Sequence, residues 1–434
     1  MFPTAANGLT GGRFDASNTR RSLTSTILAA IAKSGALVVA LLLTLLIASR
    51  PLPAQTETIL HQFNNGSDGA EPMGQLTPDG AGNFYGTTDI GGMGHGTIFK
   101  LAPNGSGSWT ETIIYSFTDD LDGGYPFFTT LIFDKQGNFY GTTTGGGVTG
   151  HGVVFEFSPV GTGWQETILY SVGQDGSAGC FDPWGGVVMD SAGNLYGLCL
   201  VSGFPQTAAV FQLSQSGGVW TQTVIYNYNS AADNNGGGGL AIDAKGNIFA
   251  MLSAAYGAPR LVELSPNGNG GWTPTALATF RKNIFPESVP TLDSAGNIYG
   301  TTQAGGAYGR GTVYEFSPGN NGKWTQKTLY SFGGSKNGIG PYGGLVLDVS
   351  GNIYGTASFG GKWDAGTVFE LTPNGQGGYQ EKLLWTFDLK DGDGPLSTLT
   401  MDSAGHLYGV TPSGGQGKNC VGPDVCGIAF EVSP

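Results

Sequence analysis

Two histidines, His95 and His151, each stand between glycines in a GHG triplet, and Arg310 occupies the matching place in a later segment. Imidazoles held at equivalent positions of adjacent structural units can bind a metal ion or an acidic ligand, and an arginine can pair with a carboxylate. No third metal ligand is fixed at the same spacing. The simpler interpretation, which we favour for the histidines, is that both are loop residues tolerated between glycines.

Aspartates gather in two short glycine-containing segments, DDLDGG and DLKDGDG. Oxygen ligands beside glycines suit calcium, although neither segment matches the full calcium loop of the helix-loop-helix type. Asp122 and Asp391 each precede a proline by four residues, which is typical of turns. Calcium binding is therefore one hypothesis for these acids, and turn formation is the other. The aspartates concerned are Asp119, Asp120, Asp122, Asp388, Asp391 and Asp393.

The linear motifs of common enzymes give no support for catalysis. The sequence contains no G-x-S-x-G elbow, no P-loop and no H-E-x-x-H. GGGVTG at 145–150 matches G-x-G-x-x-G formally, but it joins two expected antiparallel strands and opens no helix. Carboxylates from distant segments can still converge without a linear signature. We therefore assign no catalytic residue and favour a protein that is not an enzyme.

A decapeptide repeat organises the chain. DSAGNIYGTT at 293–302 has relatives that begin at Asp79, Asp134, Asp190, Asp243, Asp348 and Asp402. The seven copies follow one another about 54 residues apart, and such a period must be settled first because it determines the fold. The leading Asp can accept hydrogen bonds from the backbone of a turn, and the Gly at its fourth position supplies a positive φ. The decapeptide is thus predicted to be a structural hairpin and not a site.

One copy, residues 343–387, shows four short strand-like runs: GGLVLD, NIYGTAS, GTVFELTP and YQEKLLWTF. Seven repeats of four antiparallel strands predict an all-β, seven-bladed β-propeller; an open β-solenoid is the weaker alternative. The last copy lacks a fourth strand, whereas TETILHQF at 56–63 is a spare one. The N-terminal strand should therefore complete the last blade. A tryptophan opens the fourth strand in five copies, where packing between blades is favoured over stacking on sugars.

The first 54 residues differ in kind from the rest. Basic residues precede the apolar run ALVVALLLTLLIA, and LPA follows at 52–54. This order predicts an export signal cut after Ala54, or an uncleaved anchor, followed by a single propeller domain over 55–434. Without this segment the chain carries 14 basic and 31 acidic side chains, a formal charge of −17. That charge argues against a nucleic-acid partner. We expect an extracellular, periplasmic or cell-surface protein with no integral membrane domain once the signal is removed.

Export permits disulfides, and the sequence has four cysteines. Cys420 and Cys426 close the short loop CVGPDVC and are expected to pair. Cys180 and Cys199 either pair or stay free, because strand register decides the outcome.

The motifs LYSF, DG-x-x-P, D-x-x-GN-[LFI]YGTT and GTV[FY][EK][LF][ST]P resemble the GloVer (Gloeo/Verruco) tandem repeat of exported bacterial proteins. The resemblance covers residues 56–434 and is weaker in the third, fourth and seventh copies. It implies an exported propeller-like protein and no particular activity.

Function on a rigid ring usually resides in its variable loops, here those on the face opposite the D-x-x-GN turns. We therefore expect a binding or surface-interaction module for a glycan or protein, with a polysaccharide lyase or hydrolase and a purely structural envelope protein as alternatives.

Overall fold

The computed structural model describes residues 55–174, 180–201, 207–228, 238–252, 258–281, 284–319, 322–334, 336–420 and 426–433. The chain divides into two compact units, Met1–Ala54 and Gln55–Pro434. The predicted export segment lies outside the described residues, so all that follows concerns the second unit. In its described residues the regular structure is β, and none of the described segments is a helix long and apolar enough to cross a membrane.

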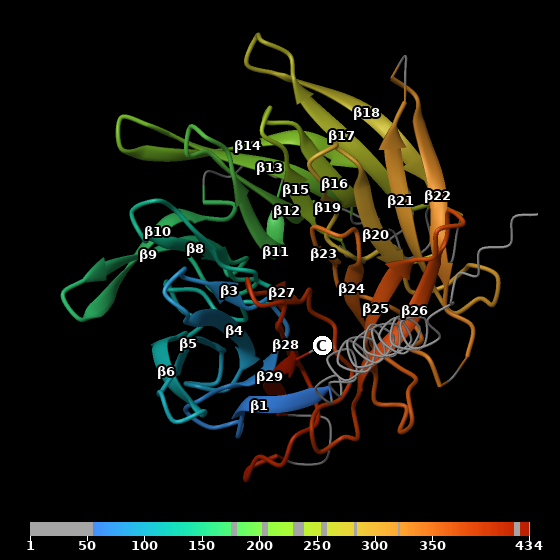
Figure 1. Ribbon diagram of the computed structural model, residues 1–434. Coiled ribbons are helices and arrows are strands. Elements are labelled where there is room, and N and C mark those ends of the chain that lie inside the picture. Colours follow the sequence, from blue (N-terminus) through green and yellow to red (C-terminus); the bar gives the residue numbers. More distant parts are fainter. Residues whose placement is uncertain are drawn as a thin grey trace, which may run out of the picture. The chain divides into compact units, whose positions relative to one another are not determined.

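Seven antiparallel sheets, the blades, follow one another along the described chain (Figure 1). Blade 1 comprises β3 (Thr77–Pro78), β4 (Phe84–Ile90), β5 (Thr97–Pro103) and β6 (Trp109–Ser116), and blade 2 comprises β7 (Ile132–Phe133), β8 (Phe139–Thr142), β9 (Val153–Val160) and β10 (Gly163–Ser171). Blade 3 comprises β11 (Phe181–Met189), β12 (Leu195–Val201), β13 (Thr207–Ser216) and β14 (Val219–Tyr228). Blade 4 comprises β15 (Leu240–Ile242), β16 (Ile248–Leu252), β17 (Arg260–Pro266) and β18 (Trp272–Thr279). Blade 1 also carries the short β2 (Ala70–Pro72).

Blades 5 to 7 repeat the same order of strands. Blade 5 comprises β19 (Thr291–Leu292), β20 (Ile298–Thr302), β21 (Thr312–Pro318) and β22 (Trp324–Ser331). Blade 6 comprises β23 (Val346–Leu347), β24 (Ile353–Ala357), β25 (Thr367–Pro373) and β26 (Tyr379–Thr386). Blade 7 comprises β27 (Thr400–Met401), β28 (Leu407–Thr411), β29 (Ile428–Ser433) and β1 (Thr56–Gln62). The four strands expected in residues 343–387 are therefore confirmed as β23 to β26.

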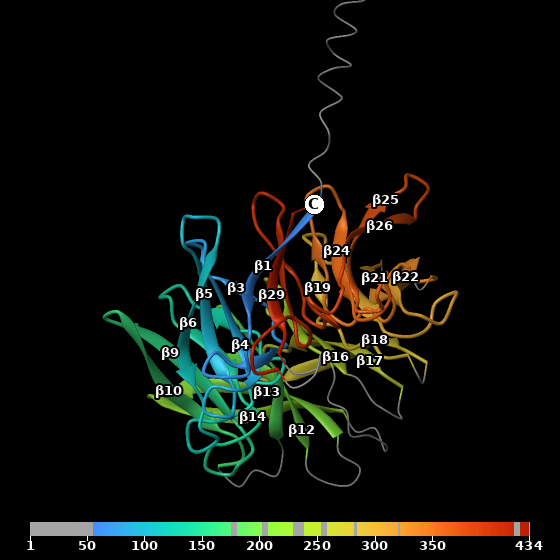
Figure 2. The same cartoon turned by 90° about the horizontal axis from the view of Figure 1, so that it is seen from below.

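The ring closes through the N-terminal strand. β1 pairs with β29 in antiparallel register from Thr56↔Ser433 to Gln62↔Ile428, which completes blade 7. Figure 2 shows β1 beside β29. Each of seven apolar clusters joins two neighbouring blades, and one of them joins Tyr408 of blade 7 to Phe84 and Phe99 of blade 1. The seven-bladed propeller and its closure are thus confirmed.

The turn between the first two strands of each blade is built by the repeated aspartate. In blade 3, Asp190 Oδ1 accepts hydrogen bonds from the backbone N–H groups of Ala192 (2.8 Å) and Asn194 (2.9 Å). Its Oδ2 accepts bonds from Asn194 Nδ2 (2.8 Å) and from the Tyr196 hydroxyl (2.8 Å). Burial alone would raise the pKa of Asp190, but these hydrogen bonds outweigh burial and lower it. The fourth residue, Gly193, has φ 86°, as the sequence predicted.

The glycine of the YGT motif is required by the strand beside it. Gly355 on β24 lies opposite Phe369 on β25, and a Cβ at Gly355 would come within 2.7 Å of the phenyl Cζ atom. Blades 1, 2, 3 and 7 have the same pair of glycine and phenylalanine, and in blade 5 tyrosine replaces phenylalanine. Blade 4 instead places Ala250 opposite Val262. The added methyl group is matched there by a smaller partner.

The aromatic residue that opens the fourth strand packs against the preceding blade. Trp164 contacts Tyr85 of blade 1 at 5.9 Å between ring centroids, and Trp272 contacts Tyr196 of blade 3 at 5.5 Å. Trp324 lies 6.3 Å from Phe249 of blade 4. The expected packing role is confirmed, because these rings join apolar clusters between blades.

Both disulfides are formed. Cys420 pairs with Cys426, as expected, and Cys180 pairs with Cys199 across a Cα–Cα distance of 5.4 Å. The second pairing, which the sequence left open, joins the start of blade 3 to its own second strand.

We predict that Gly355→Ala destabilises the protein by about 1–3 kcal/mol, because the new methyl group overpacks against Phe369. Adding Phe369→Val should recover part of the loss, since blade 4 already combines alanine with valine. Denaturant unfolding of the two single variants and the double variant measures the coupling. A double variant whose loss equals the sum of the single losses would contradict this account.

Candidate functional site

The predicted histidine sites lie in the loops between the second and third strands, on the face opposite the aspartate turns, which we call the top face. His95 Nδ1 lies 2.9 Å from the Tyr125 hydroxyl and 3.8 Å from Asp119 Oδ2. His151 Nδ1 lies 3.3 Å from Asp182 Oδ1. His95 thus pairs with the loop that enters blade 2, and His151 pairs with the first strand of blade 3, β11.

The backbone at these positions links one blade to the next. The carbonyls of His95 and His151 accept hydrogen bonds from Tyr125 N (2.8 Å) and Asp182 N (3.1 Å). The same carbonyl bond recurs at Arg310, Ala365 and Cys426. The linking atom is shared by all residue types, so the link between blades does not depend on which side chain stands at this position.

The predicted calcium ligands mostly brace their own loops. Asp122 accepts hydrogen bonds from Thr118 N (2.9 Å), Thr118 Oγ1 (2.6 Å) and the Tyr115 hydroxyl (3.1 Å). Asp391 accepts bonds from Asp388 N (2.6 Å) and Trp385 Nε1 (3.0 Å). In the described residues no three His, Cys, Asp or Glu side chains form a group that could hold a metal ion. The geometry therefore favours turn formation for these two acids, and calcium binding stays a prediction.

The remaining acids of the same segments also lie in tight loops. Asp119 has a positive φ of 59°, and its carboxylate lies against Gly124 and Gly145. The Asp120 carbonyl accepts a bond from Gly147 N, Asp388 Oδ1 accepts one from Lys390 N, and Asp393 N donates to the Ser413 carbonyl.

A second set of acids lies between blades and was not found in the sequence. Glu57, Glu111 and Glu166 hold the same place on the fourth strand, and each has a buried Oε1 atom without a hydrogen-bond partner. Burial raises the pKa of Glu57 to about 8, helped by Asp391 and Asp388. Burial likewise raises the pKa of Glu111 to about 7, helped by Asp68.

The same arrangement surrounds Glu166, where burial and Asp122 raise the pKa to about 7 although the Tyr115 hydroxyl opposes this. At the matching place between blades 5 and 6, Asn337 replaces the loop aspartate. Its Nδ2 donates to Glu381 Oε2 at 2.6 Å. The amide supplies the hydrogen that a neighbouring carboxylate lacks, so a bound proton would serve the same purpose at the other three places.

The narrow upper part of the central channel is lined by a ring of variable residues. In six of the seven blades one of them follows the proline at the entry of the blade, directly or, in blade 2, one residue later: Met73, Phe128, Trp184, Glu287, Tyr342 and Leu396. The Phe128 ring stacks between Trp184 (5.8 Å) and Tyr342 (5.5 Å). The cavity left is about 40 Å³, room for a few waters. The sequence repeat does not reveal this ring, because the proline recurs from blade to blade whereas the type of the residue that follows it changes.

The top face also carries exposed apolar side chains. Each is between 43% and 69% exposed: Met93, Leu121, Val148, Tyr308, Phe359, Trp363 and Leu389. Trp363 lies beside Arg310, the predicted carboxylate partner, in a shallow hollow of about 720 Å³. Lys362 Nζ is 4.5 Å from the centroid of the indole ring.

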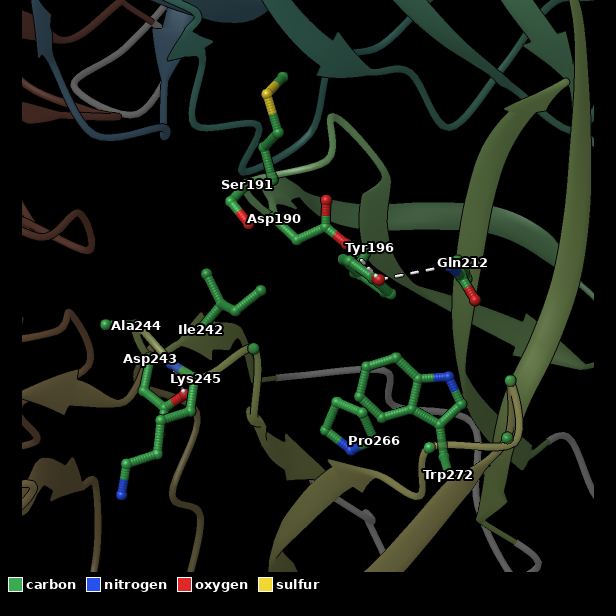
Figure 3. Close-up of a pocket in the computed structure, with 15 residues that line it drawn as sticks. Asp190, Ser191, Tyr196, Gln212, Ile242, Asp243, Ala244, Lys245, Pro266 and Trp272 are labelled. Carbon is green, nitrogen blue, oxygen red and sulfur yellow. Dashed lines mark hydrogen bonds between the residues drawn. The ribbon is translucent and has the colours of Figure 1, made fainter.

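Two cavities on the opposite, bottom face flank the turn at 242–245. The first, about 480 Å³, lies between blades 3 and 4 (Figure 3). Trp272 and Pro266 form one side, and the hydrogen-bonded pair Tyr196 and Gln212 forms the other. The second, about 630 Å³, lies between blades 4 and 5 and is lined by Phe249, Glu263 and Trp324.

Comparisons with known proteins bear on family and fold. The model of the Gloeobacter/Verrucomicrobia repeat matches residues 49–260 and 255–422. No curated protein matches the chain.

Solved structures resemble the chain over most of its length at low identity. A protein of unknown function from Dyadobacter fermentans is 13% identical, with a TM-score of 0.44 over 88% of this chain and 100% of that one. The PQQ-bound aldose sugar dehydrogenase of Streptomyces coelicolor is 11% identical, with a TM-score of 0.43 over the same shares. A 6-phosphogluconolactonase described as putative, from Bacteroides uniformis, is 17% identical, with a TM-score of 0.47 over 72% and 84%. These values carry no argument about activity.

We predict that the free energy of unfolding falls as the pH rises from about 5 to about 8. The raised pKa values keep protons on Glu111 and Glu166 up to about pH 7 and on Glu57 up to about pH 8 in the folded protein, whereas the unfolded chain releases them near the ordinary pKa of 4.5. Thermal unfolding at both pH values measures the change. Replacing all three with Gln should flatten the dependence, and Asn337→Asp should steepen it. An unchanged slope in the triple variant would contradict the prediction.

Proposed function

Because the chain belongs to the Gloeobacter/Verrucomicrobia repeat family, whose repeats here build a closed propeller, we propose that it is a non-catalytic binding module whose top face contacts a macromolecular ligand. The observation that carries this proposal is the set of exposed apolar side chains on that face. Large apolar groups exposed together mark interaction surfaces in soluble proteins.

The top loops hold these side chains on a rigid backbone. Within the loops, Gly96 N donates to the Gly91 carbonyl, Gly311 N to that of Gly305 and Gly366 N to that of Gly360. The Thr88 hydroxyl also donates to the carbonyl of Ile90 at 3.0 Å. A loop already fixed in its bound form loses less conformational entropy on binding, so such loops suit recognition.

The chemistry of the hollow near Trp363 suggests the kind of ligand. Arg310 and Lys362 place two cations beside an exposed indole ring in a chain that is acidic overall. A protein segment with apolar and acidic residues fits this surface, and an acidic glycan is the other candidate.

Export completes the proposal. The signal-like residues 1–54 and the two disulfides support an extracellular, periplasmic or cell-surface location, because such bonds persist in oxidising compartments.

An enzyme acting on polysaccharides is a second candidate, and Glu287 in the central channel favours it. Burial raises the pKa of this carboxyl, as a general acid requires, although a hydrogen bond from Tyr342 opposes the shift. Among the described residues that line the narrow channel, however, Glu287 is the one carboxylate, whereas glycosidases use two. A purely structural envelope role remains the third candidate.

The test uses purified residues 55–434 against a panel of polysaccharides and the extracellular proteins of the source organism, with calcium and with chelator. We expect retention without release of sugar ends. Trp363→Ser with Tyr308→Ser should weaken retention about tenfold or more, because both rings leave the contact surface. Val349→Ser, an exposed residue of a bottom turn, is the matched control.

Release of sugar fragments would replace the binding proposal with the enzyme. Retention that is unchanged in the variant carrying Trp363→Ser and Tyr308→Ser would exclude the top face as the contact surface. No retention of any ligand would favour the structural role. Retention lost in chelator would support the calcium hypothesis.

A further inference from the structure

Blade 4 lacks a hydroxyl that other blades use to join two polar groups. In blade 6, the Tyr354 hydroxyl lies 3.2 Å from Asp348 Oδ2 of the turn and 3.2 Å from Glu370 Oε1 of the third strand. In blade 3, the Tyr196 hydroxyl similarly joins Asp190 and Gln212. The corresponding residue in blade 4 is Phe249.

The two groups that this hydroxyl would join are still present in blade 4. Asp243 keeps its turn, with bonds from Lys245 N (2.9 Å), Asn247 N (2.8 Å) and Asn247 Nδ2 (2.8 Å). Glu263 accepts a long bond of 3.4 Å from Ser265 Oγ. No protein hydroxyl bridges the two carboxylates in the described structure. Both carboxylates therefore retain capacity to accept hydrogen bonds.

A cavity of about 630 Å³ opens at this place, between blades 4 and 5. Asp243, Glu263 and Phe249 line it together with the indole of Trp324 and the exposed Lys245. Its volume is in the range of small-molecule sites. Across the turn at 242–245, the cavity with Trp272 (Figure 3) shares the same turn residues and offers a second indole.

We propose that this bottom-face cavity binds a neutral glycan, one of whose hydroxyl groups takes the place of the missing tyrosine hydroxyl between Asp243 and Glu263. A sugar ring presents apolar C–H groups to the Trp324 indole and hydroxyl donors to the carboxylates. The neighbouring cavity takes the adjoining sugar through Trp272.

The charges select against other ligands. The two carboxylates and the acidic surface repel phosphorylated or sulfated compounds. Lys245 offsets the negative charge and disfavours a cationic ligand. A polyhydroxylated neutral molecule satisfies the acceptors without burying an uncompensated charge. The site is separate from the top face, so it stands or falls independently of the proposed function.

The decisive variant is Phe249→Tyr, which restores the residue found in the other blades and occupies the position assigned to the ligand hydroxyl. Isothermal titration with neutral oligosaccharides, such as gluco-, xylo- and chito-oligosaccharides, should show binding by residues 55–434. Phe249→Tyr should weaken that binding by roughly tenfold or more, the value of one hydrogen bond to a charged acceptor, without lowering the melting temperature. Trp324→Phe should also weaken it.

Tyr354→Phe is the matched control, because it removes the same hydroxyl from blade 6, and it should leave affinity unchanged. Trp363→Ser on the top face should also leave it unchanged. Absence of binding to every oligosaccharide, or equal binding by the wild type and Phe249→Tyr, would overturn the proposal. A loss of affinity in Trp363→Ser instead would place the glycan on the top face and likewise overturn it.

Discussion

The pairing of β1 with β29 is the interaction on which the ring depends. Without it blade 7 would have three strands. The apolar cluster that contains Tyr408 would also lose Leu60 and Phe63, which β1 and the residue after it supply. The pairing joins residues near both ends of the propeller, and burial of the apolar cluster between blades 7 and 1 helps to offset the entropy lost on closing the ring. Every other blade can then hold its neighbours at a fixed angle, which keeps the top loops and bottom turns in place.

The sequence was sufficient for the architecture because the repeated residues are those that the backbone needs. Asp190, Gly193 and Gly355 each satisfy a local demand for a hydrogen-bond acceptor, a positive φ or a small side chain. Such demands recur in each blade and are visible as a period. The pairing of Cys180 with Cys199 depended on strand register and was not visible.

The candidate sites were harder to find for the opposite reason. Trp184, Tyr342 and Phe128 meet at the axis from three blades, and no linear spacing brings them together. The acids between blades needed the ring to place Glu166 near Asp122. For Asp122 and Asp391 the sequence left calcium binding and turn formation open, and the hydrogen bonds within their loops are visible only in the structure. Sequence reasoning also treated the departures in the fourth copy as weak repeat signal, although Phe249 and Ala250 reshape that blade.

The carbonyl link at His95, His151 and Arg310 has a consequence for how such a protein can change. The backbone carbonyl that holds neighbouring blades together is present in every amino acid. The side chain, which carries the chemistry, is not needed for this link. A substitution at these positions therefore leaves the link between blades in place. The side chains on the top face can therefore differ from blade to blade, while the backbone that positions them stays the same.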